Sequence, residues 1–298
     1  MARKKKGDPV HGWVCFDKPY GMTSTSAVGK VRWLYQAQKA GHAGTLDPLA
    51  TGILPIALGE ATKTVAVVQG GGKRYRFDLT WGAATSTDDA EGPVVATSDV
   101  RPDEAAVRAM LPRFTGTILQ RPPAFSAIKV DGERAYDLAR AGEIVELAER
   151  PVTIDELTLL SHSGERSSFE MACEKGTYVR SLARDLAEAL GTRGHVTALR
   201  RTVVGRFTEQ NAVSIEALET SDDRDALLTP LEVPLRTLPE LPMTAEDAVL
   251  LRNGGVVLLR GAGAPIALSE AWASCGGRAV AMGEVRAGQF HPSRVLKA

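Results

Sequence analysis

One short stretch of the chain combines a lone carboxylate with three glycines. Residues 41–52 are Gly-His-Ala-Gly-Thr-Leu-Asp-Pro-Leu-Ala-Thr-Gly, and Asp47 is the only ionisable carboxylate among them. Glycine permits backbone geometries that other residues resist, and the residue before a proline is pushed towards extended conformations. A carboxylate held stiffly in a loop of small residues could act as a single catalytic acid. An Asp-Pro pair more often forms an Asx turn, in which the carboxylate bonds its own backbone, so the local sequence leaves Asp47 a candidate only.

Tyr75 and Arg180 are the next candidates for chemistry. Tyr75 shares the apolar side of a predicted strand with Phe77, Leu79 and Trp81, and this pattern by itself favours a core tyrosine with a satisfied hydroxyl. Arg180 falls in the first turn of a helix predicted over 178–190, where the helix dipole disfavours a cation. An arginine in that place usually meets an anion. That anion could be a structural acid, a functional carboxylate or a phosphate.

Residues 121–142 interleave positive charge with aromatic rings. Lys129 and Arg140 lie in this stretch with Phe125 and Tyr136. Such a mixture suits looped RNA, because bases stack on the rings and phosphates pair with the cations. A solvated surface loop would have the same composition, so this signal is weak alone.

The elements that must position these residues follow from periodicity and turn signals. Thr23 or Ser24 is predicted to cap the first helix, and Thr177 to cap the helix that carries Arg180, which Gly191 would end. The proline-rich segment 230–243 is predicted to be a linker that docks rather than a free coil. The predicted strands are 12–17, 75–81, 152–160, 167–174, 256–260, 265–269, 278–283 and 294–297, and the predicted helices are 25–37, 60–68, 102–111, 178–190 and 244–252. Residues 53–58 could be a buried strand or an apolar exit from the glycine loop, and residues 195–207 mix apolar strand character with arginines.

The 298 residues are enough for one large domain and a smaller one, and the net charge is zero. Charge is segregated, with a basic run near the N-terminus and an acidic segment over 216–247, so a polyanion-binding face can exist within a neutral total. The three cysteines are widely spaced, which indicates a reducing cytoplasm and argues against a zinc site or disulfides. No apolar stretch has the length of a membrane span, and no secretory signal is expected.

Several ordered motifs resemble those of the bacterial tRNA pseudouridine-55 synthase family, TruB. The resemblance covers about the first three quarters of the chain, and the remainder resembles the family's small PUA-like RNA-binding appendage by position and β-rich pattern. The matching stretches are Asp17-Lys18-Pro19 with Gly21 and Thr23-Ser24 (opening motif), 41–52 (catalytic loop), Lys73-Arg74-Tyr75 (tyrosine motif), 125–142 (RNA-clasping insertion), and 175–182 with Leu199-Arg200-Arg201 (the last two motifs).

The resemblance implies an α+β fold, with a mixed, mostly antiparallel sheet, flanking helices and an active site in a basic cleft. It implies a pseudouridine synthase catalytic domain over 1–235, with the insertion at about 121–150, and a PUA-like domain over 236–298. The implied reaction converts the uridine at position 55 in the T-loop of tRNA to pseudouridine. The base flips out, the C–N bond breaks, the uracil rotates and a C–C bond forms, without cofactor or metal.

The same resemblance assigns roles to individual residues. Asp47 would be the nucleophile, with Tyr75 and Arg180 as its closest neighbours. His42 and Tyr178 would contact the target nucleotide or the opened loop, and Leu199 would form part of an apolar wall. Lys18, Lys129 and Arg140 would bind the RNA. The expected partner is tRNA, and the expected enzyme is a cytoplasmic monomer that needs no protein partner and no membrane.

The sequence leaves open whether Asp47 attacks C6 of uracil or C1′ of ribose. Tyr75 is available to take the C5 proton, although a pKa of about 10 makes tyrosine a poor base. Three rivals share some features: a guide-RNA-directed dyskerin-type synthase, an RNA-binding folding factor, and an aspartyl-phosphate enzyme. The short C-terminal tail favours a stand-alone enzyme over the first. The set Asp47, Tyr75 and Arg180 favours catalysis over the second. The third would need a DxDxT motif or a cluster of Mg²⁺-binding carboxylates, and neither accompanies Asp47.

Overall fold

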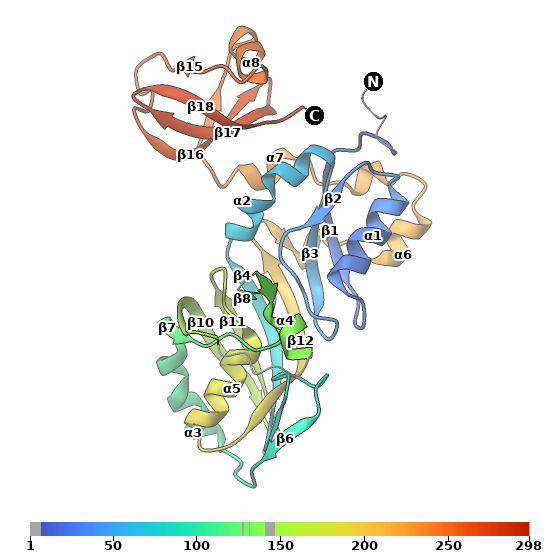
Figure 1. The fold of residues 1–298 in the computed structure, drawn as a ribbon, viewed down its shortest axis with the longest axis vertical. Helices are drawn as coiled ribbons and strands as arrows, with labels where there is room; N and C mark the ends of the chain where they lie inside the picture. Colours follow the sequence, from blue (N-terminus) through green and yellow to red (C-terminus); the bar gives the residue numbers. More distant parts are fainter. Residues whose placement is uncertain (1–6, 127, 131, 141–146, 298) are drawn as a thin grey trace.

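The structure, a computed structural model, describes residues 7–126, 128–130, 132–140 and 147–297. It contains two large sheets, and Figure 1 shows the smaller of them at one end of an elongated molecule, beyond α2 and α7. The larger sheet has nine strands in the order β1-β3-β12-β4-β11-β10-β7, with β2 added to β3 and β13 to β12. These strands are β1 (Gly12–Lys18), β2 (Ala40–His42), β3 (Thr51–Leu58), β4 (Lys73–Trp81), β7 (Gly116–Gln120), β10 (Arg150–His162), β11 (Arg166–Cys173), β12 (Gly194–Val204) and β13 (Phe207–Thr208).

The large sheet is mixed and mostly antiparallel, as predicted. Its parallel contact joins β12 to β3 through two register pairs, Arg200 with Thr51 and Arg201 with Gly52. The other pairings of its described strands are antiparallel. Gly52 has φ of +96°, and a Cβ there would lie 2.2 Å from the Arg201 carbonyl oxygen. Glycine at 52 therefore permits the close approach that joins the two halves of the sheet.

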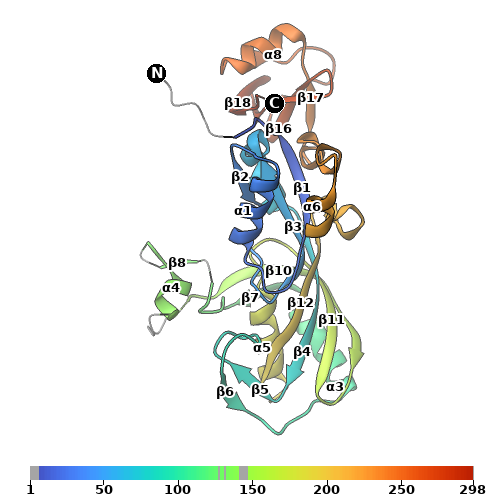
Figure 2. The ribbon, with the colours of Figure 1, turned by 90° about the vertical axis from the view of Figure 1, so that its right-hand side faces the viewer.

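Helices cover the sheet and connect its strands. α5 (Val179–Ala189) packs Leu182 and Leu186 into one cluster with Phe77 and Leu79 of β4, and Figure 2 shows it beside β12 and β4. The other helical elements of this part are α1 (Ser24–Leu34), η1 (Gly59–Thr64), α2 (Val65–Gly70), α3 (Glu104–Met110), η2 (Leu111–Phe114), α4 (Ala135–Arg140), η3 (Glu209–Asn211), α6 (Ile215–Thr220), η4 (Asp225–Leu227) and α7 (Glu232–Leu235). Two short hairpins complete it, β5 (Ala83–Thr85) with β6 (Val94–Thr97) and β8 (Lys129–Val130) with β9 (Glu133–Arg134).

The two faces of this sheet differ in chemistry because side chains alternate along each strand. Tyr75, Phe77, Leu79 and Trp81 of β4 are buried on the side that α5 covers. We call the opposite side the open face. It carries a network of cross-strand ion pairs formed by Arg74, Arg76, Glu156, Glu170, Arg200 and Glu209.

The smaller sheet follows the proline-rich segment and has the order β14-β16-β17-β18-β15. The buried apolar residues of the smaller sheet pack against residues of the large sheet. Trp13 and Phe207 pack with Leu235 of α7 and with Trp272 and Leu296 of the C-terminal region in one buried group. The segment 230–243 is thus docked, as predicted. The elements are β14 (Glu240–Pro242), α8 (Ala245–Arg252), β15 (Val257–Leu258), β16 (Leu268–Cys275), β17 (Arg278–Arg286) and β18 (Gln289–Val295).

Several element boundaries differ from the predicted ones for physical reasons. Asp103, rather than Pro102, precedes α3 and caps it by accepting from the Ala106 N–H. The predicted Thr177 cap is wrong, because Thr177 donates its hydroxyl to the Glu174 carbonyl while Gln120 bonds the Tyr178 backbone. α1 ends at Leu34, since Gln36 takes a left-handed φ of +51°. In the C-terminal sheet the predicted strands 265–269 and 294–297 are displaced to β16 and β18, and 278–283 is extended in β17.

Other boundary predictions are confirmed. Thr23 caps α1, the pair Thr244 and Asp247 forms a capping box on α8, and Gly191 follows α5 with φ of +72°. Cys15, Cys173 and Cys275 are free thiols. Among the described residues, no helix has the length and apolar character needed to cross a membrane.

Candidate active site

The predicted glycine loop is partly strand. His42 ends β2 and Thr51 begins β3, so the irregular part is residues 43–50, which we call the Asp47 loop. The Ser24 hydroxyl, on the first residue of α1, accepts from the Leu46 N–H at 2.8 Å and donates to the Leu46 carbonyl at 2.9 Å. The Ala50 N–H donates to the Asp47 carbonyl at 3.0 Å and closes a turn over Pro48. The backbone next to Asp47 is therefore fixed on both sides.

The Asp47 carboxylate pairs with Arg180. Arg180 Nη2 lies 2.9 Å from Asp47 Oδ2, and the arginine side chain is 6% exposed whereas the aspartate side chain is 37% exposed. The cation is thus buried behind a carboxylate that still faces open space. Such a charge-assisted hydrogen bond fixes the direction of the carboxylate. Of the two interpretations of Asp47, this geometry supports a carboxylate directed at a cation instead of at its own backbone.

Arg180 makes further contacts that explain its position at the start of α5. Its Nε lies 3.5 Å from Asp89 Oδ2, Nη1 donates to the Thr87 carbonyl at 2.9 Å, and Nη2 donates to the Phe125 carbonyl at 3.0 Å. A cation at the start of a helix is expected to pair with an anion, and Arg180 pairs with two, Asp47 and Asp89. A guanidinium bonded at all three nitrogens presents Nη2 to Asp47 in one orientation.

Residues 86–92 form a polar turn, as their sequence predicts, but the sequence does not predict that Asp89 of this turn pairs with Arg180. Asp89 is buried, Asp88 has a left-handed φ of +60°, and Arg184 Nη1 lies 2.9 Å from Asp88 Oδ2. Arg180 and Arg184 are four residues apart, so they lie on one face of α5 and each receives one of the two adjacent acids. The signal available in the sequence was this spacing of two arginines against an Asp-Asp pair, but the polar turn at 86–92 had no visible link to the helix.

Tyr75 lies next to Arg201 across the β4–β12 pairing. The two residues are register partners, and the Arg201 side chain hydrogen-bonds the Tyr75 hydroxyl. Tyr75 is 8% exposed. Burial raises the pKa of the Tyr75 hydroxyl, and the positive charge of Arg201 opposes that rise. A tyrosine with a raised pKa stays protonated at neutral pH, which weakens the prediction that it takes the C5 proton.

His42, Leu199 and Tyr178 surround the same region. Burial lowers the pKa of His42, Arg201 lowers it further, and its Nδ1 is buried without a hydrogen-bond partner among the described residues. A neutral imidazole follows. Leu199 is the register partner of Phe77 and is 9% exposed, so it lies on the Tyr75 side of the sheet. Tyr178 precedes α5, with its ring 5.3 Å from Arg150 Cζ and its backbone bonded by Gln120.

Lys18 does not lie where the prediction placed it. Its side chain is fully buried, and its ammonium donates to the carbonyls of Met22, Pro19 and Pro48 at 2.7, 3.1 and 3.3 Å. Burial lowers the pKa of Lys18 to about 8. An ammonium in this position holds the Asp47 loop at Pro48, and it does not reach the surface that an RNA phosphate would touch.

The predicted RNA-clasping insertion stands out from the body of the sheet as β8 and α4 (Figure 2). Phe125 and Tyr136 make an edge-on contact with ring centroids 6.0 Å apart. Lys129 lies in β8 and Arg140 ends α4, but the side chains of both lie outside the described part of the chain. Their predicted contacts with RNA stay predictions.

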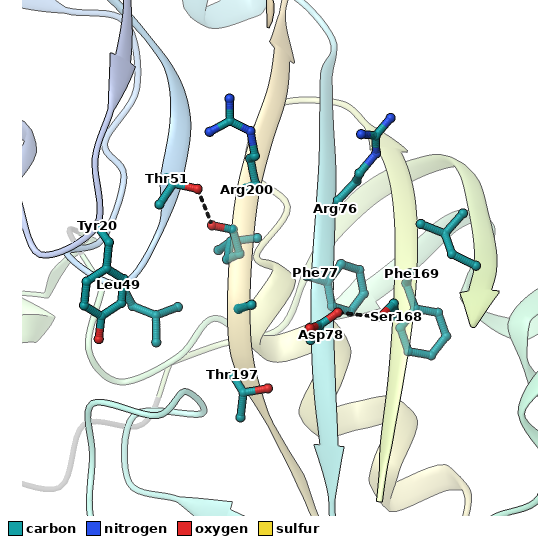
Figure 3. Close-up of a pocket in the computed structure, with 13 residues that line it drawn as sticks. Tyr20, Leu49, Thr51, Arg76, Phe77, Asp78, Ser168, Phe169, Thr197 and Arg200 are labelled. Atoms are coloured by element: carbon teal, nitrogen blue, oxygen red, sulfur yellow. Dashed lines mark hydrogen bonds between the residues drawn. The ribbon is translucent and has the colours of Figure 1, made fainter. Parts of the chain in front are cut away.

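A pocket of about 390 Å³ lies on the open face of the sheet, behind the Asp47 site. Figure 3 shows Tyr20, Leu49 and Thr51 on one side of it and Arg200, Arg76 and Asp78 across from them, on β12 and β4. Asp47 and Arg180 do not line it. Leu49 and Leu199 belong to its wall. No group of three possible metal-binding side chains occurs in the part of the chain that the structure describes.

Comparison with known proteins agrees with this geometry. Residues 32–179 match the model of the TruB family pseudouridylate synthase N-terminal domain, and residues 180–236 match that of the tRNA pseudouridylate synthase B C-terminal domain. The chain is 50% identical to tRNA pseudouridine synthase B of Mesorhizobium japonicum, over 98% of each chain, and 53% identical to that of Dinoroseobacter shibae, over 100% and 99%.

Solved structures resemble the chain in fold. The archaeal box H/ACA sRNP Nop10-Cbf5 complex contains a chain that matches with a TM-score of 0.73 at 23% identity, over 100% of this chain and 92% of that one. A chain of a Cbf5-Nop10-Gar1 complex matches with a TM-score of 0.71 at 24% identity, over 96% and 84%. At these identities the likeness concerns the fold alone.

Proposed function

The chain belongs to the TruB family of pseudouridylate synthases, and we propose that it isomerises the T-loop uridine at position 55 of tRNA to pseudouridine. The observation that carries this proposal is the pair of Asp47 and the buried Arg180 at 2.9 Å. A single carboxylate, directed by a cation and still open to a substrate, suits a reaction that needs one nucleophile.

The target base must leave its stack before Asp47 can reach it, and this step costs a few kcal/mol and is cheapest in a loop. The neutral His42 would occupy the space that the base vacates. The Tyr75 ring would stack on the flipped uracil, and Leu199 would close the apolar side of the pocket. These contacts suit a planar, uncharged base.

Asp47 acts as the nucleophile in this proposal. Arg180 Nη2, at 2.9 Å, fixes the direction of the carboxylate that attacks. Asp47 forms a bond to the nucleotide, the bond between N1 and C1′ breaks, and the uracil rotates to present C5. C5 then bonds C1′, Asp47 is released, and the C5 proton leaves while N1, whose bond to the sugar has broken, takes up a proton. Attack on C6 and attack on C1′ both fit the position of the carboxylate.

The raised pKa of Tyr75 favours a role other than the base for the C5 proton. Its hydroxyl accepts a hydrogen bond from Arg201 and its ring faces the site, which suits stacking. Removal of the C5 proton by the Asp47 carboxylate, after its release from the nucleotide, needs no further side chain. The enzyme itself needs no net gain or loss of electrons, because the reaction is an isomerisation.

Binding of tRNA extends beyond the target base in this proposal. The insertion at about 121–150, with Lys129 and Arg140, would clasp the T-arm, and Tyr178 would contact the opened loop. Residues 1–235 form the catalytic domain, and residues 236–298 form a small PUA-like domain that adds RNA contacts. The enzyme acts as a cytoplasmic monomer without a protein partner or cofactor.

A tritium-release assay tests the proposal. A tRNA transcript labelled with tritium at C5 of uridine should release tritium to water, up to one equivalent per tRNA. The matched control is a transcript with cytidine at position 55, which should release none above background. A protein that binds the transcript tightly and releases no tritium would be an RNA-binding folding factor, and the proposed activity would be refuted.

A further inference from the structure

Arg201 is a buried cation bonded to both ends of the Asp47 loop. Its Nη2 donates to the Gly44 carbonyl at 3.0 Å and its Nη1 to the Thr45 carbonyl at 3.4 Å, before Asp47 in the chain. Its Nε donates to the Ile53 carbonyl at 2.8 Å, after the loop has entered β3. The side chain is 1% exposed. One planar group therefore fixes the distance between the two stems of the loop.

The partners of Arg201 differ in kind from those of its neighbours. Arg180 and Arg200 each pair with two carboxylates. Among the described residues, no carboxylate oxygen lies within 4.0 Å of the Arg201 side-chain nitrogens. Its bonds go to main-chain oxygens and to the Tyr75 hydroxyl. Five rigid donors match this arrangement, which a lysine with three donors on a flexible stem could not reproduce.

The register of β12 explains why Arg201, and not Arg200, faces the site. Arg201 pairs with Tyr75 and Arg200 pairs with Arg76, so the two arginines lie on opposite faces of the sheet. The charge of Arg201 also acts on the site, because it adds to the burial that lowers the pKa of His42 and of Lys73. The guanidinium thus contacts the backbone of the Asp47 loop and the Tyr75 hydroxyl, and its charge lowers the pKa of His42.

We propose that Arg201 is a positioning residue for pseudouridine formation: its guanidinium holds both stems of the Asp47 loop and the Tyr75 hydroxyl in register, and thereby directs the Asp47 carboxylate at the nucleotide. This inference rests on the proposed function. Arg201 acts through the loop and through Tyr75 rather than on the substrate, so its loss should change the rate of the chemical step more than the affinity for tRNA.

The variants Arg201→Lys and Arg201→Ala test the proposal, with Arg200→Lys as the matched control on the same strand. Arg201→Lys keeps the charge but loses the fork, and its kcat should fall about 100-fold, the loss expected from a displacement of about 1 Å in a reacting group. Its KM for tRNA should stay within about threefold. Arg200→Lys should keep kcat within about threefold, since the Arg200 side chain pairs with Asp17 and Glu209 and not with the Asp47 loop or Tyr75.

Chemical rescue separates positioning from a loss of folded protein. Guanidinium added to Arg201→Ala should restore part of kcat in a saturable manner, while methylammonium at equal concentration should not, because it lacks the planar fork. Circular dichroism of each variant gives the folded fraction, to which kcat is normalised. A normalised kcat of Arg201→Lys within threefold of wild type, or a rise in KM alone, would overturn the positioning role.

If neither Arg201 variant folds, hydrogen exchange in the wild-type protein tests the proposal instead. In protein labelled with ¹⁵N-arginine, the Nε–H of Arg201 should be protected from exchange with water, both free and with a T-arm RNA bound, whereas that of the more exposed Arg200 should exchange faster. Fast exchange at Arg201 would overturn the proposal. A wild-type enzyme that forms no pseudouridine would refute the proposed function, whereas an active wild type matched by Arg201→Lys would refute only the role of Arg201.

Discussion

The two faces of the central sheet use arginine in opposite ways. On the side covered by α5, Arg180 and Arg201 are 6% and 1% exposed, and each is bonded on several sides. On the open face, the side chains of Arg74 and Arg76 are 37% and 57% exposed, and both pair with Glu170. Arginine side chains thus hold the active site in place on the α5 side and form a solvent-exposed network of ion pairs on the open face.

The energetics of the two faces differ accordingly. An exposed ion pair contributes between zero and about 1 kcal/mol to stability, because water competes for both charges. A buried charge that loses its partner costs about 3–5 kcal/mol, because the remaining charge has no solvent to replace it. Substitutions on the α5 side should therefore change both rate and stability, and those on the open face should change little.

The largest effect is expected for Asp47→Asn. The amide keeps the shape of the side chain but cannot form the covalent bond, so turnover should fall by about 10⁴-fold or more. Affinity for tRNA should change by less than about twofold, since the amide has the same size as the carboxylate and binding of the ground state does not need the covalent bond. Tritium release and filter binding measure the two quantities. Turnover above a tenth of the wild-type rate would remove Asp47 from the nucleophile role.

Arg180→Ala should have the next largest effect. Loss of the guanidinium leaves Asp47 undirected and Asp89 buried without its cation, so the rate should fall by about 10²–10⁴-fold and the free energy of unfolding by about 3–5 kcal/mol. Single-turnover assays and urea denaturation measure these. Arg180→Lys is the control that keeps the charge, and it should recover part of the stability and less of the rate. An unchanged rate in Arg180→Ala would contradict the ion-pair role.

Lys18 makes the stability of the active-site region depend on pH, because it is a buried cation bonded to the Asp47 loop. Burial lowers its pKa from 10.5 to about 8, so between these values the unfolded chain binds more protons than the folded one. The free energy of unfolding should then rise with pH across this window. The difference in unfolding free energy between wild type and Lys18→Met should grow from pH 7.5 to pH 10, measured by urea denaturation. A difference that stays constant with pH would place the Lys18 titration outside this window.

The sequence predicted the parts of the site that depend on local signals. The position of Arg180 at a helix start indicated a nearby anion, and the glycine loop made Asp47 a candidate carboxylate; the structure pairs the two. Tyr75 was placed on the correct side of its strand by simple alternation. The mixed, mostly antiparallel sheet came from the resemblance to a known family, and the strand pairings support it.

The parts that the sequence did not predict depend on contacts between distant segments. Asp89 reaches Arg180 across about ninety residues of chain, and nothing in the turn at 86–92 names its partner. Lys18 was predicted to bind RNA, but its ammonium donates to three carbonyls and its side chain is buried. The direction of Arg201 is set by irregularities in the register of β12, between Val196 and Ala198 and between Arg201 and Val203. Such bulges shift the alternation that sequence patterns rely on.

Arg76→Ala should have the smallest effect, and it tests the open face most directly. Arg76 Nε lies 2.9 Å from Glu170 Oε1, but Arg74 also pairs with Glu170, so the glutamate keeps a cation after the substitution. The free energy of unfolding should fall by less than about 1 kcal/mol, measured by urea denaturation.

Tritium release by Arg76→Ala should stay within about twofold of wild type, because the Tyr75 side of β4 is untouched. Arg76 also lines the pocket behind the site (Figure 3), so a tenfold loss of activity with unchanged stability would show that RNA uses that pocket. Both faces of the sheet would then bind RNA. The distinction between a buried catalytic face and a solvated face without function would be wrong.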